Sequence, residues 1–406
     1  MRFNPENIRL SDYIYDLPAE RIAKYPLPER DRSRLLVYNN GRISNSIFKD
    51  VPLFLSEGNT LVFNDTKVIH ARLHFRKTTG ALIEVFCLEP IYPPGYEQTF
   101  QSEKSCTWKC LIGNRKKWKK GVLKRQLSIN NSKIVLKAEK ISGTENSEYI
   151  HFSWEPQNIT FSEIIEKAGI IPIPPYLNRE SETGDDIWYQ TVYAKNNGSV
   201  AAPTAGFHFT NTVLKELQNR RLNNIKLTLH VGAGTFVPVK GSDIKDHKMH
   251  TEHFFIQKEQ LKAIYKGLNQ IIAIGTTSVR TLESLYWLGV KISEQENLLP
   301  NDLFIDQWEP YSLNKDINPA DSIKNLLRFM EKNTLEKIEG ITRIVIVPGY
   351  RFRMIRGMVT NFHQPRSTLL LLIAAFIGDD WRKVYEYALN HNFRFLSYGD
   401  SSLLIP

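Results

Sequence analysis

The sequence predicts an α/β protein whose main domain is interrupted by a small antiparallel β module. Over the second half of the chain, short apolar runs alternate with helical patterns, which is typical of an α/β domain with mostly parallel strand pairing. Between about residues 72 and 155 the pattern changes to short strand-like runs separated by Gly, Pro, Asn and Ser. The 406 residues, 42% of them hydrophobic, suffice for two domains and a sizeable core.

The first half supplies one strand of the main domain and then the β module. Residues 60–67, "TLVFNDTK", predict a buried strand that runs into a polar loop. Strands of the module are expected at 81–88, 106–112, 123–129 and 133–141. A helix over 162–168 and the rigid "PIPP" at 172–175 return the chain to the main domain. The expected domains are therefore 1–71 with 156–406, and the inserted 72–155.

The second half predicts alternating helices and strands. Helices are expected at 211–222 with Thr210 as N-cap, at 258–268, from Ser278 onward, and at 368–377 with Ser367 as N-cap. Strands are expected at 225–232, 271–277, 343–349, 358–362 and 393–399. Residues 306–340 are polar and irregular apart from an amphipathic helix near 321–332, so we expect an excursion from the main domain.

Positive charge is concentrated in one segment. The net charge is +10, and residues 101–140 alone contain twelve Lys and Arg against two acids, again +10. Basic side chains neutralise phosphates and aromatic faces stack on bases. Trp108 and Trp118 lie in this segment, so it is either a nucleic-acid surface or a solvated basic face. The lysines singled out for RNA binding are Lys116, Lys117, Lys119 and Lys120.

Several classes of protein are not favoured. The start of the chain does not resemble a secretory signal, and the longest apolar run, Leu369–Ile377, is too short to span a bilayer. Three cysteines, Cys87, Cys106 and Cys110, indicate a reducing compartment without a disulfide framework. We therefore expect a cytoplasmic protein with no membrane partner.

Metal and dinucleotide sites are also not expected. His247, His250 and His253 are spaced so that no single helix or strand gathers all three on one side. Cys106 and Cys110 lack the second ligand pair that tetrahedral zinc needs. The "GAGTF" of 232–236 lacks the third glycine of a dinucleotide fingerprint.

Polar segments follow several of the expected strands. They are 64–72, 230–236, 275–281, 360–368 and 397–400. Ligands of α/β proteins gather at the carboxyl ends of strands, so these segments predict one shared pocket. Each segment alone could equally be turn chemistry. The segment 275–281 opens a helix and could bind an anion through free N–H groups, or Thr276 and Thr277 could simply cap that helix.

The run "SVAAPTAGFHFT" at 199–210 is made mostly of small residues. Such residues let the backbone approach a flat ligand closely, and Phe207 and Phe209 could flank it. His208 would then point inward as a proton carrier near neutral pH. The alternative is tight packing between backbone segments.

Eight blocks of the sequence resemble one family. They are "YDLPAERIAKYPLPERDRSRLLV" (15–37), "NDTKVIHARL" (64–73), "YQTVYAKNNGSVAAPTAGFHF" (189–209), "LHVGAGTFVPV" (229–239), "HKMHTE" (247–252), "GTTSVRTLES" (275–284), "PGYRFRMIRGMVTNFHQPRSTLL" (348–370) and "FRFLSYGDSSLL" (393–404). They resemble the S-adenosylmethionine:tRNA ribosyltransferase-isomerases of queuosine biosynthesis. The resemblance implies an α/β barrel-like main domain with an inserted small β-barrel domain.

The resemblance also implies a reaction. The ribosyl part of S-adenosylmethionine moves onto 7-aminomethyl-7-deazaguanine at the tRNA wobble position, giving epoxyqueuosine while adenine and methionine leave. S-adenosylmethionine is then a consumed substrate, so no cofactor and no metal are expected. The expected partners are tRNA and S-adenosylmethionine, and a monomer is expected. The enzyme needs a general base, an acid for adenine and a pocket that excludes water.

Candidate site residues follow from the polar segments and the resemblance together. His208, Asp65 and His363 are expected to be catalytic, with Asp65 the second choice as base. The residues expected to bind substrate are Lys67, Arg72, Thr204, Gly206, His230, His250, Glu252, Thr276, Thr277, Arg280 and Asn361.

Three features depart from the family pattern. His70 stands where proline is usual, Arg366 stands where Lys or Gln is usual, and 306–340 is longer than usual. They leave open a second hypothesis, an RNA-binding paralogue of this fold whose catalytic activity is altered or lost. Intact polar segments favour the enzyme.

Overall fold

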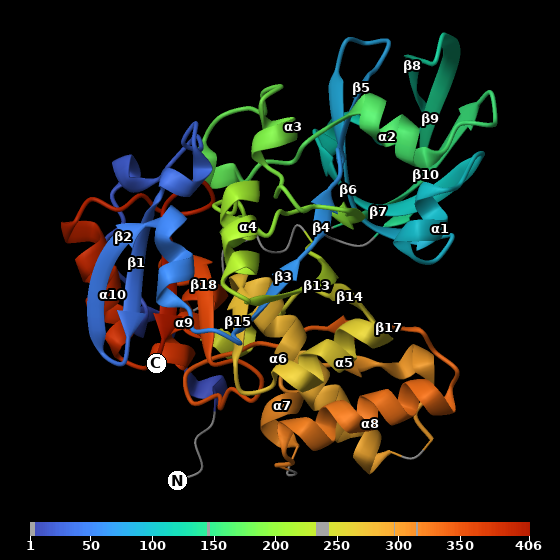
Figure 1. The fold of residues 1–406 in the computed structure, drawn as a ribbon. Helices are drawn as coiled ribbons and strands as arrows, with labels where there is room; N and C mark the ends of the chain where they lie inside the picture. Colours follow the sequence, from blue (N-terminus) through green and yellow to red (C-terminus); the bar gives the residue numbers. More distant parts are fainter. Residues whose placement is uncertain (1–4, 144–146, 233–242, 296, 314–315) are drawn as a thin grey trace.

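The computed structural model describes residues 5–143, 147–232, 243–295, 297–313 and 316–406 (Figure 1). These residues form a mixed α/β structure with a ten-stranded sheet, a seven-stranded sheet and a two-stranded sheet. The predicted α/β class is therefore confirmed. In Figure 1 the seven-stranded sheet stands at the upper right, and most of the helices surround the larger sheet.

The ten-stranded sheet contains both parallel and antiparallel pairs. Its order is β16 (Phe304–Ile305), β17 (Lys337–Thr342), β14 (Glu252–Gln257), β13 (Asn223–His230), β3 (Thr60–Asn64), β15 (Ile271–Ile274), β18 (Gly357–Asn361), β19 (Ser401–Ile405), β1 (Arg34–Asn39) and β2 (Arg42–Ile47). The central block β13-β3-β15-β18 is parallel throughout. Antiparallel partners flank it, since β14 pairs with β13 and β19 pairs with β18. Two further pairs, β1 with β19 and β16 with β17, are parallel, so five of the nine strand pairs of this sheet are parallel, as expected.

Three of the four central strands are buried along their whole length. Every residue of β3, β15 and β18 is buried. This is why their sequences are short apolar runs without alternation, as expected for parallel strands covered on both faces. Because these strands are parallel, their carboxyl ends meet at one edge of the sheet.

Helices cover the ten-stranded sheet. They are α4 (Asn211–Asn219), α5 (Lys258–Gly267), α6 (Gly275–Glu294), α8 (Pro319–Lys332), α9 (Thr368–Ile377) and α10 (Asp380–Asn390). The hydroxyl of Thr210 accepts from the Val213 amide at 3.3 Å, and that of Ser367 accepts from the Leu370 amide at 3.1 Å, so both predicted N-caps are confirmed. Helix α6 is buried almost throughout from Gly275 to Val290.

The segment 306–340 does not leave the main domain. It contains α7 (Glu309–Ser312) and α8, and Ile323, Leu326 and Met330 of α8 are fully buried in the main core. The expectation of an excursion was wrong because the apolar face of α8 packs on the sheet-covering helices, whereas the average composition of the segment reflects only its polar residues.

Two predicted strands lie elsewhere. The strand expected at 343–349 is β17, at Lys337–Thr342, and the strand expected at 393–399 is β19, at Ser401–Ile405. Helix α6 begins at Gly275, so the strand before it ends at Ile274 and not at 277. The apolar run at 343–349 follows its ladder, the run at 393–399 precedes its ladder, and 275–277 already belongs to the helix, so burial alone does not mark a strand's bounds.

The seven-stranded sheet is antiparallel. Its order is β11 (Gly169–Ile170), β5 (Arg72–Arg76), β6 (Leu82–Tyr92), β7 (Ser105–Gly113), β10 (Glu148–Glu155), β9 (Ser132–Gly143) and β8 (Leu123–Ile129). It has its own core, which includes Trp108, Trp154 and Phe161 and is closed by α1 (Tyr96–Phe100) and α2 (Phe161–Ala168). The four strands predicted for the β module are therefore confirmed.

A small parallel pair joins the two regions. Strand β4 (Thr66–Val68) follows β3 and pairs with β12 (Asn196–Ser199). The short helix α3 (Asp185–Trp188) precedes β12. Among the described residues, no helix is both long and apolar enough to cross a membrane.

Candidate functional site

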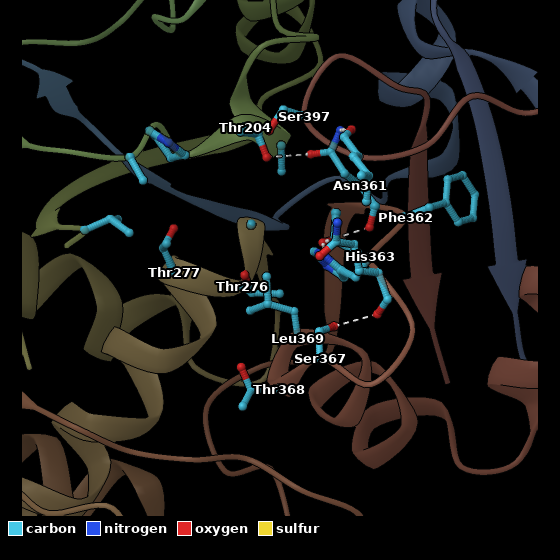
Figure 2. A pocket seen from close by; sticks show the side chains of 18 of the residues that line it. Thr204, Thr276, Thr277, Asn361, Phe362, His363, Ser367, Thr368, Leu369 and Ser397 are labelled. Atoms are coloured by element: carbon cyan, nitrogen blue, oxygen red, sulfur yellow. Dashed lines mark hydrogen bonds between the residues drawn. The ribbon is translucent and has the colours of Figure 1, made fainter. Parts of the chain in front are cut away.

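A cavity of about 360 Å³ lies at the edge of the sheet where the central strands end (Figure 2). Its walls come mainly from 201–205, 275–277, 360–369 and 396–397. Volumes of this size are typical of sites for small organic molecules. The structure thus brings together Thr204, His250, Thr276, Thr277, Arg280, Asn361 and His363 of the residues expected at the site.

The walls also contain residues that precede antiparallel strands. His250 comes just before β14, and Leu396 and Ser397 come before β19. Because β14 and β19 run against their neighbours, their amino ends lie at the same edge as the carboxyl ends of β13 and β18. Five polar segments were expected here. The segment 64–72 does not line the cavity, and 233–236 lies outside the described residues.

The first turn of α6 forms one wall. Gly275 has φ 85°, a conformation that glycine adopts readily, and it turns the chain sharply from β15 into the helix. The N-cap residue Ile274 has no side chain that can accept from the first amides. The hydroxyl of Thr277 is buried and has no hydrogen-bond partner among the described residues. In Figure 2, Thr276 and Thr277 lie across the cavity from His363.

Arg280 lies one turn further along the same face of α6. Its Nε donates to the Ile344 carbonyl at 3.2 Å, and its Nη1 lies 2.6 Å from Oε2 of Glu252. The other oxygen of Glu252 lies 2.9 Å from Nε2 of His250. Burial would raise the pKa of Glu252, but Arg280 and His250 outweigh it and hold that pKa below its ordinary value. Glu252 is therefore an anion fixed between two basic groups.

Asn361 at the end of β18 is held on both sides of its amide. Its Oδ1 accepts from the Thr204 hydroxyl at 3.1 Å, which Figure 2 draws as a dashed line. Its Nδ2 lies 3.3 Å from the Leu396 carbonyl and 3.2 Å from Nε2 of His208. The amide orientation is thus fixed by three elements of the sheet edge.

His363 lines the cavity. Its backbone amide donates to the Tyr385 hydroxyl at 3.0 Å, and its Nε2 lies 2.9 Å from the Thr360 hydroxyl. Burial lowers its pKa to about 3, so the imidazole is neutral at physiological pH. A neutral imidazole can accept a proton or donate a hydrogen bond.

His208 does not line this cavity but lies behind Asn361. Its Nδ1 lies 2.7 Å from the Ser33 hydroxyl, and its ring packs against Phe48 with centroids 5.0 Å apart. Burial, with help from Arg394 and Arg30, lowers its pKa to about 3. Phe207 and Phe209 also turn away from the cavity, packing on Tyr398 and on Phe48 respectively. We expected His208 to point into the pocket with Phe207 and Phe209 flanking a ligand. The structure instead places all three outside the cavity wall.

The small residues before His208 serve two different purposes. Ala201, Ala202 and Ala205 do line the cavity. Gly206 does not line the cavity. A Cβ at this position would meet the Tyr193 hydroxyl at 2.0 Å. Its lack of a side chain therefore allows close internal packing, which is the alternative that the sequence left open.

Asp65, Lys67 and Arg72 lie outside the cavity wall. Asp65 is buried, and its Oδ1 accepts from the hydroxyl of Thr228 at 2.6 Å. Lys67 is exposed on β4. Arg72 lies on the seven-stranded sheet, 3.1 Å from Glu84. The reason is β4, which leads the chain after Asp65 towards the smaller sheet.

His230 and Glu252 also lie behind the wall. His230 lies 2.9 Å from the Thr66 hydroxyl and packs on Tyr96 at 4.5 Å. Burial lowers its pKa to about 3. Glu252 is 1% exposed and reaches the cavity only through its partners Arg280 and His250.

Sequence reasoning missed two tyrosines in the wall, whereas the serine beside them belongs to the expected segment 397–400. Tyr176, Tyr189 and Ser397 line the cavity, and the Tyr176 hydroxyl bonds to that of Ser397. Tyr189 and Ser397 lie in sequence blocks that carry the family resemblance, which was the available signal. Tyr176 follows "PIPP" directly and carried no signal of its own.

The basic segment is only partly as expected. Lys116, Lys117, Lys119 and Lys120 are all exposed beside the short helix Arg115–Lys117. Trp108 and Trp118 are completely buried in the core of the seven-stranded sheet, so they do not offer faces for base stacking. Trp108 ends a run of three buried residues in β7, and the indole of Trp118 donates to the Gly121 carbonyl at 2.9 Å. This surface therefore offers charge without aromatic platforms.

The histidines of 247–253 do not gather around one point. His247 and His250 line the cavity, whereas His253 packs against Tyr96 at 6.1 Å. Within the described ranges, no group of three or more His, Cys, Asp or Glu side chains is placed to hold a metal ion.

Fold and cavity together define an α/β protein with a partly enclosed site, lined by many polar groups, for a small organic ligand. The family described as "Queuosine biosynthesis protein" matches residues 10–404 of the chain. A relative from Halothermothrix orenii named S-adenosylmethionine:tRNA ribosyltransferase-isomerase is 36% identical, with 98% of this chain and 100% of the relative covered. One of the same name from a Sulfurihydrogenibium species is 37% identical, again over 98% and 100%.

A solved structure is also similar in sequence. It is S-adenosylmethionine tRNA ribosyltransferase from Thermotoga maritima, 27% identical, covering 97% of this chain and 100% of that one, with a TM-score of 0.45. The chain belongs to the queuosine biosynthesis protein family, because the family match spans almost its whole length. The resemblance seen in the sequence is thereby confirmed.

Proposed function

We propose that this protein transfers and isomerises the ribosyl moiety of S-adenosylmethionine onto 7-aminomethyl-7-deazaguanine at the wobble position of tRNA. The product is epoxyqueuosine-tRNA, and adenine and methionine are released. The observation that carries the proposal is the cavity, whose walls come from the sequence blocks 189–209, 275–284, 348–370 and 393–404. Relatives that share this name match nearly the whole chain at 36–37% identity.

The cavity suits the first half of this reaction. Removal of a proton from the carbon beside the sulfonium expels adenine. The amine of the tRNA base then attacks the ribosyl group that remains on the sulfonium. The small side chains Ala201, Ala202 and Ala205 leave room for a planar purine, while Leu369 and Phe362 restrict the access of water. Thr204 and Asn361 present fixed polar groups that can orient the bound molecule.

His363 is our choice for the group that accepts a proton. Of the three residues expected to be catalytic, it is the one that lines the cavity. Its neutral ring can take a proton from the substrate. The acid that protonates adenine must be another group, or the ring of His363 after it has taken up that proton. Asp65 and His208 are then supports of the site.

Domain organisation is part of the same proposal. Residues 1–71 and 156–406 form a barrel-like main domain, and 72–155 form an inserted small β-barrel domain. Barrel closure is supported by Arg125 of β8, which donates to the carbonyls of His74 on β5 at 3.1 Å and of Ala168 at 2.7 Å. The first and last long strands of the smaller sheet are therefore adjacent.

The inserted domain would bind the tRNA. Lys116, Lys117, Lys119 and Lys120 are exposed, and no ion pair involves them among the described residues. We further propose that the enzyme works in the cytoplasm as a monomer and uses S-adenosylmethionine as a substrate, without a separate cofactor.

The test is incubation of the purified protein with S-adenosylmethionine and RNA that carries the aminomethyl-deazaguanine. Nucleoside mass spectrometry should detect epoxyqueuosine, and free adenine and methionine should appear in equal amounts. RNA with guanine at the same position is the matched control and should stay unmodified. Binding of the RNA without any turnover would contradict the proposal.

A further inference from the structure

Arg280 has one group of donors that the protein leaves unused. Its Nε and Nη1 are occupied by the Ile344 carbonyl and by Glu252. Its Nη2 has no hydrogen-bond partner among the described residues, although the residue is only 5% exposed. A buried guanidinium nitrogen without an acceptor is costly, so an acceptor from a ligand is expected at this point.

Thr277 provides a second unused donor beside it. Its hydroxyl is buried and without a partner in the described part of the chain, and it too lines the cavity. Residues three apart lie on the same face of a helix, so Thr277 and Arg280 address the same volume. The amides of the first turn of α6, a helix of twenty residues, end at this wall without a side-chain cap. All of these donors favour an anion.

The surroundings select the kind of anion. Glu252 balances the charge of Arg280, so this pair in the wall is close to neutral. Such a site suits a single carboxylate that arrives with its own ammonium group better than a strand of many phosphates. A phosphodiester also continues on both sides, whereas a carboxylate is a chain end that can reach a buried guanidinium.

We propose that Arg280, Thr277 and the first turn of α6 bind the carboxylate of the amino-acid end of S-adenosylmethionine. This rests on the proposed function. Glu252 and His250 are positioning residues, because they hold the guanidinium so that Nη2 stays directed at the ligand. The adenosine end is then directed to the side of the cavity formed by Ala201, Ala205 and Asn361.

The experiment compares two ligands, S-adenosylmethionine and its decarboxylated analogue, by calorimetry. The parent protein should bind the complete molecule about ten- to a hundredfold more tightly, which is the range for a hydrogen-bonded ion. Arg280→Lys keeps a positive charge beside Glu252 but loses the Nη2 group, and Thr277→Val loses the hydroxyl. In each variant the preference for the carboxylate should shrink by about threefold or more, while the analogue binds as before.

Thr281→Val is the matched control. Thr281 lies one turn further along α6, donates within the helix to the Thr277 carbonyl at 3.0 Å and does not line the cavity. It should keep the full preference. If Arg280→Lys does not fold, as judged by circular dichroism, Thr277→Val carries the same test.

Two outcomes would overturn this inference alone. Equal binding of both ligands to the parent protein would show that the carboxylate is not recognised. If Arg280→Lys bound tRNA more weakly than the parent but bound S-adenosylmethionine equally well, Arg280 would be assigned to an RNA phosphate. Failure of the parent protein to bind S-adenosylmethionine at all, together with no epoxyqueuosine formed, would overturn the proposed function as well.

Discussion

The side-chain amide nitrogen of Asn361 lies 3.2 Å from Nε2 of His208, and this contact defines what the histidine does. The amide nitrogen is a donor, so Nε2 accepts and the ring proton is on Nδ1, facing the Ser33 hydroxyl at 2.7 Å. Asn361 in turn accepts from Thr204 at the cavity wall. His208 therefore orients the wall from behind as a neutral ring.

The first prediction separates this positioning role from proton transfer. His208→Ala should lower kcat/KM by about three- to tenfold, the value of one buried hydrogen bond. His208→Gln keeps an acceptor for Asn361 and should recover most of that loss. The pH profile of kcat should be the same in all three proteins. A loss of about a hundredfold or more in both variants, with a changed pH profile, would instead identify an acid or base.

The second prediction concerns stability in acid. Burial holds the pKa values of His208, His230 and His363 near 3, below the ordinary 6.5. In the unfolded chain these rings take up protons as the pH falls below about 6.5, while in the folded protein they stay neutral. The free energy of unfolding should therefore be lost steadily from pH 6.5 down to about 3.

His230→Asn tests this, since its amide can still meet the Thr66 hydroxyl. Urea unfolding at several pH values gives the slope of the free energy of unfolding against pH. For the variant this slope should correspond to the uptake of about one proton fewer on unfolding across this window. His391→Asn, at an exposed position after α10, is the control and should keep the parent slope. A His230→Asn slope equal to that of the parent would contradict the assignment.

Local signals predicted much of this fold. The caps at Thr210 and Ser367 depend on residues three positions away, and the alternation in β9 follows from neighbouring residues. The polar segments at 275–281 and 360–368 reached one cavity because parallel strands end at one edge. These features are properties of short stretches, so the sequence contains them directly.

The partners of buried polar groups were not predictable in this way. The ring of His208 contacts Ser33 and Asn361, 175 and 153 positions away, and Asp65 contacts Thr228, 163 positions away. No periodic pattern encodes such pairs. His250 and Ser397 were expected in the pocket, but their place before antiparallel strands was not, because strand direction at the sheet's flanks depends on topology.

The third prediction concerns RNA binding by the exposed lysines. Changing Lys116, Lys117, Lys119 and Lys120 to Gln should weaken tRNA binding. The slope of log affinity against log salt should also fall, by about 0.7–0.9 for each phosphate that is no longer neutralised. Filter binding at several salt concentrations measures both quantities. Binding of S-adenosylmethionine should not change.

A matched set of substitutions controls for net charge. It comprises four exposed lysines outside the seven-stranded sheet, Lys49, Lys215, Lys226 and Lys266. The control protein has the same net charge as the first and should bind tRNA nearly as the parent does. An equal loss in both proteins would mean that total charge, and not this surface, attracts the RNA.

The last prediction concerns Glu283, which is fully buried on α6 away from the cavity. Its carboxyl group receives the Tyr350 hydroxyl at 2.8 Å and the backbone amides of Arg353 at 3.1 Å and Met354 at 3.0 Å. Burial raises its pKa from the ordinary 4.5 to about 7, and these hydrogen bonds limit the rise. The folded protein thus keeps a proton on Glu283 at pH values where the unfolded chain has lost it.

The protonated carboxyl of Glu283 stabilises the folded protein only while it keeps its proton. Its contribution is complete below pH 4.5 and is lost as the pH rises through about 7. The Gln side chain of Glu283→Gln cannot titrate. The free energy of unfolding of the variant minus that of the parent should therefore rise with pH over this window, by at most roughly 3 kcal/mol. Subtracting the two curves removes the opposing contribution of the histidines. Glu386→Gln, exposed on α10, should run parallel to the parent. A difference curve that is flat, or that falls with pH, would mean that the three donors keep Glu283 ionised in the folded protein.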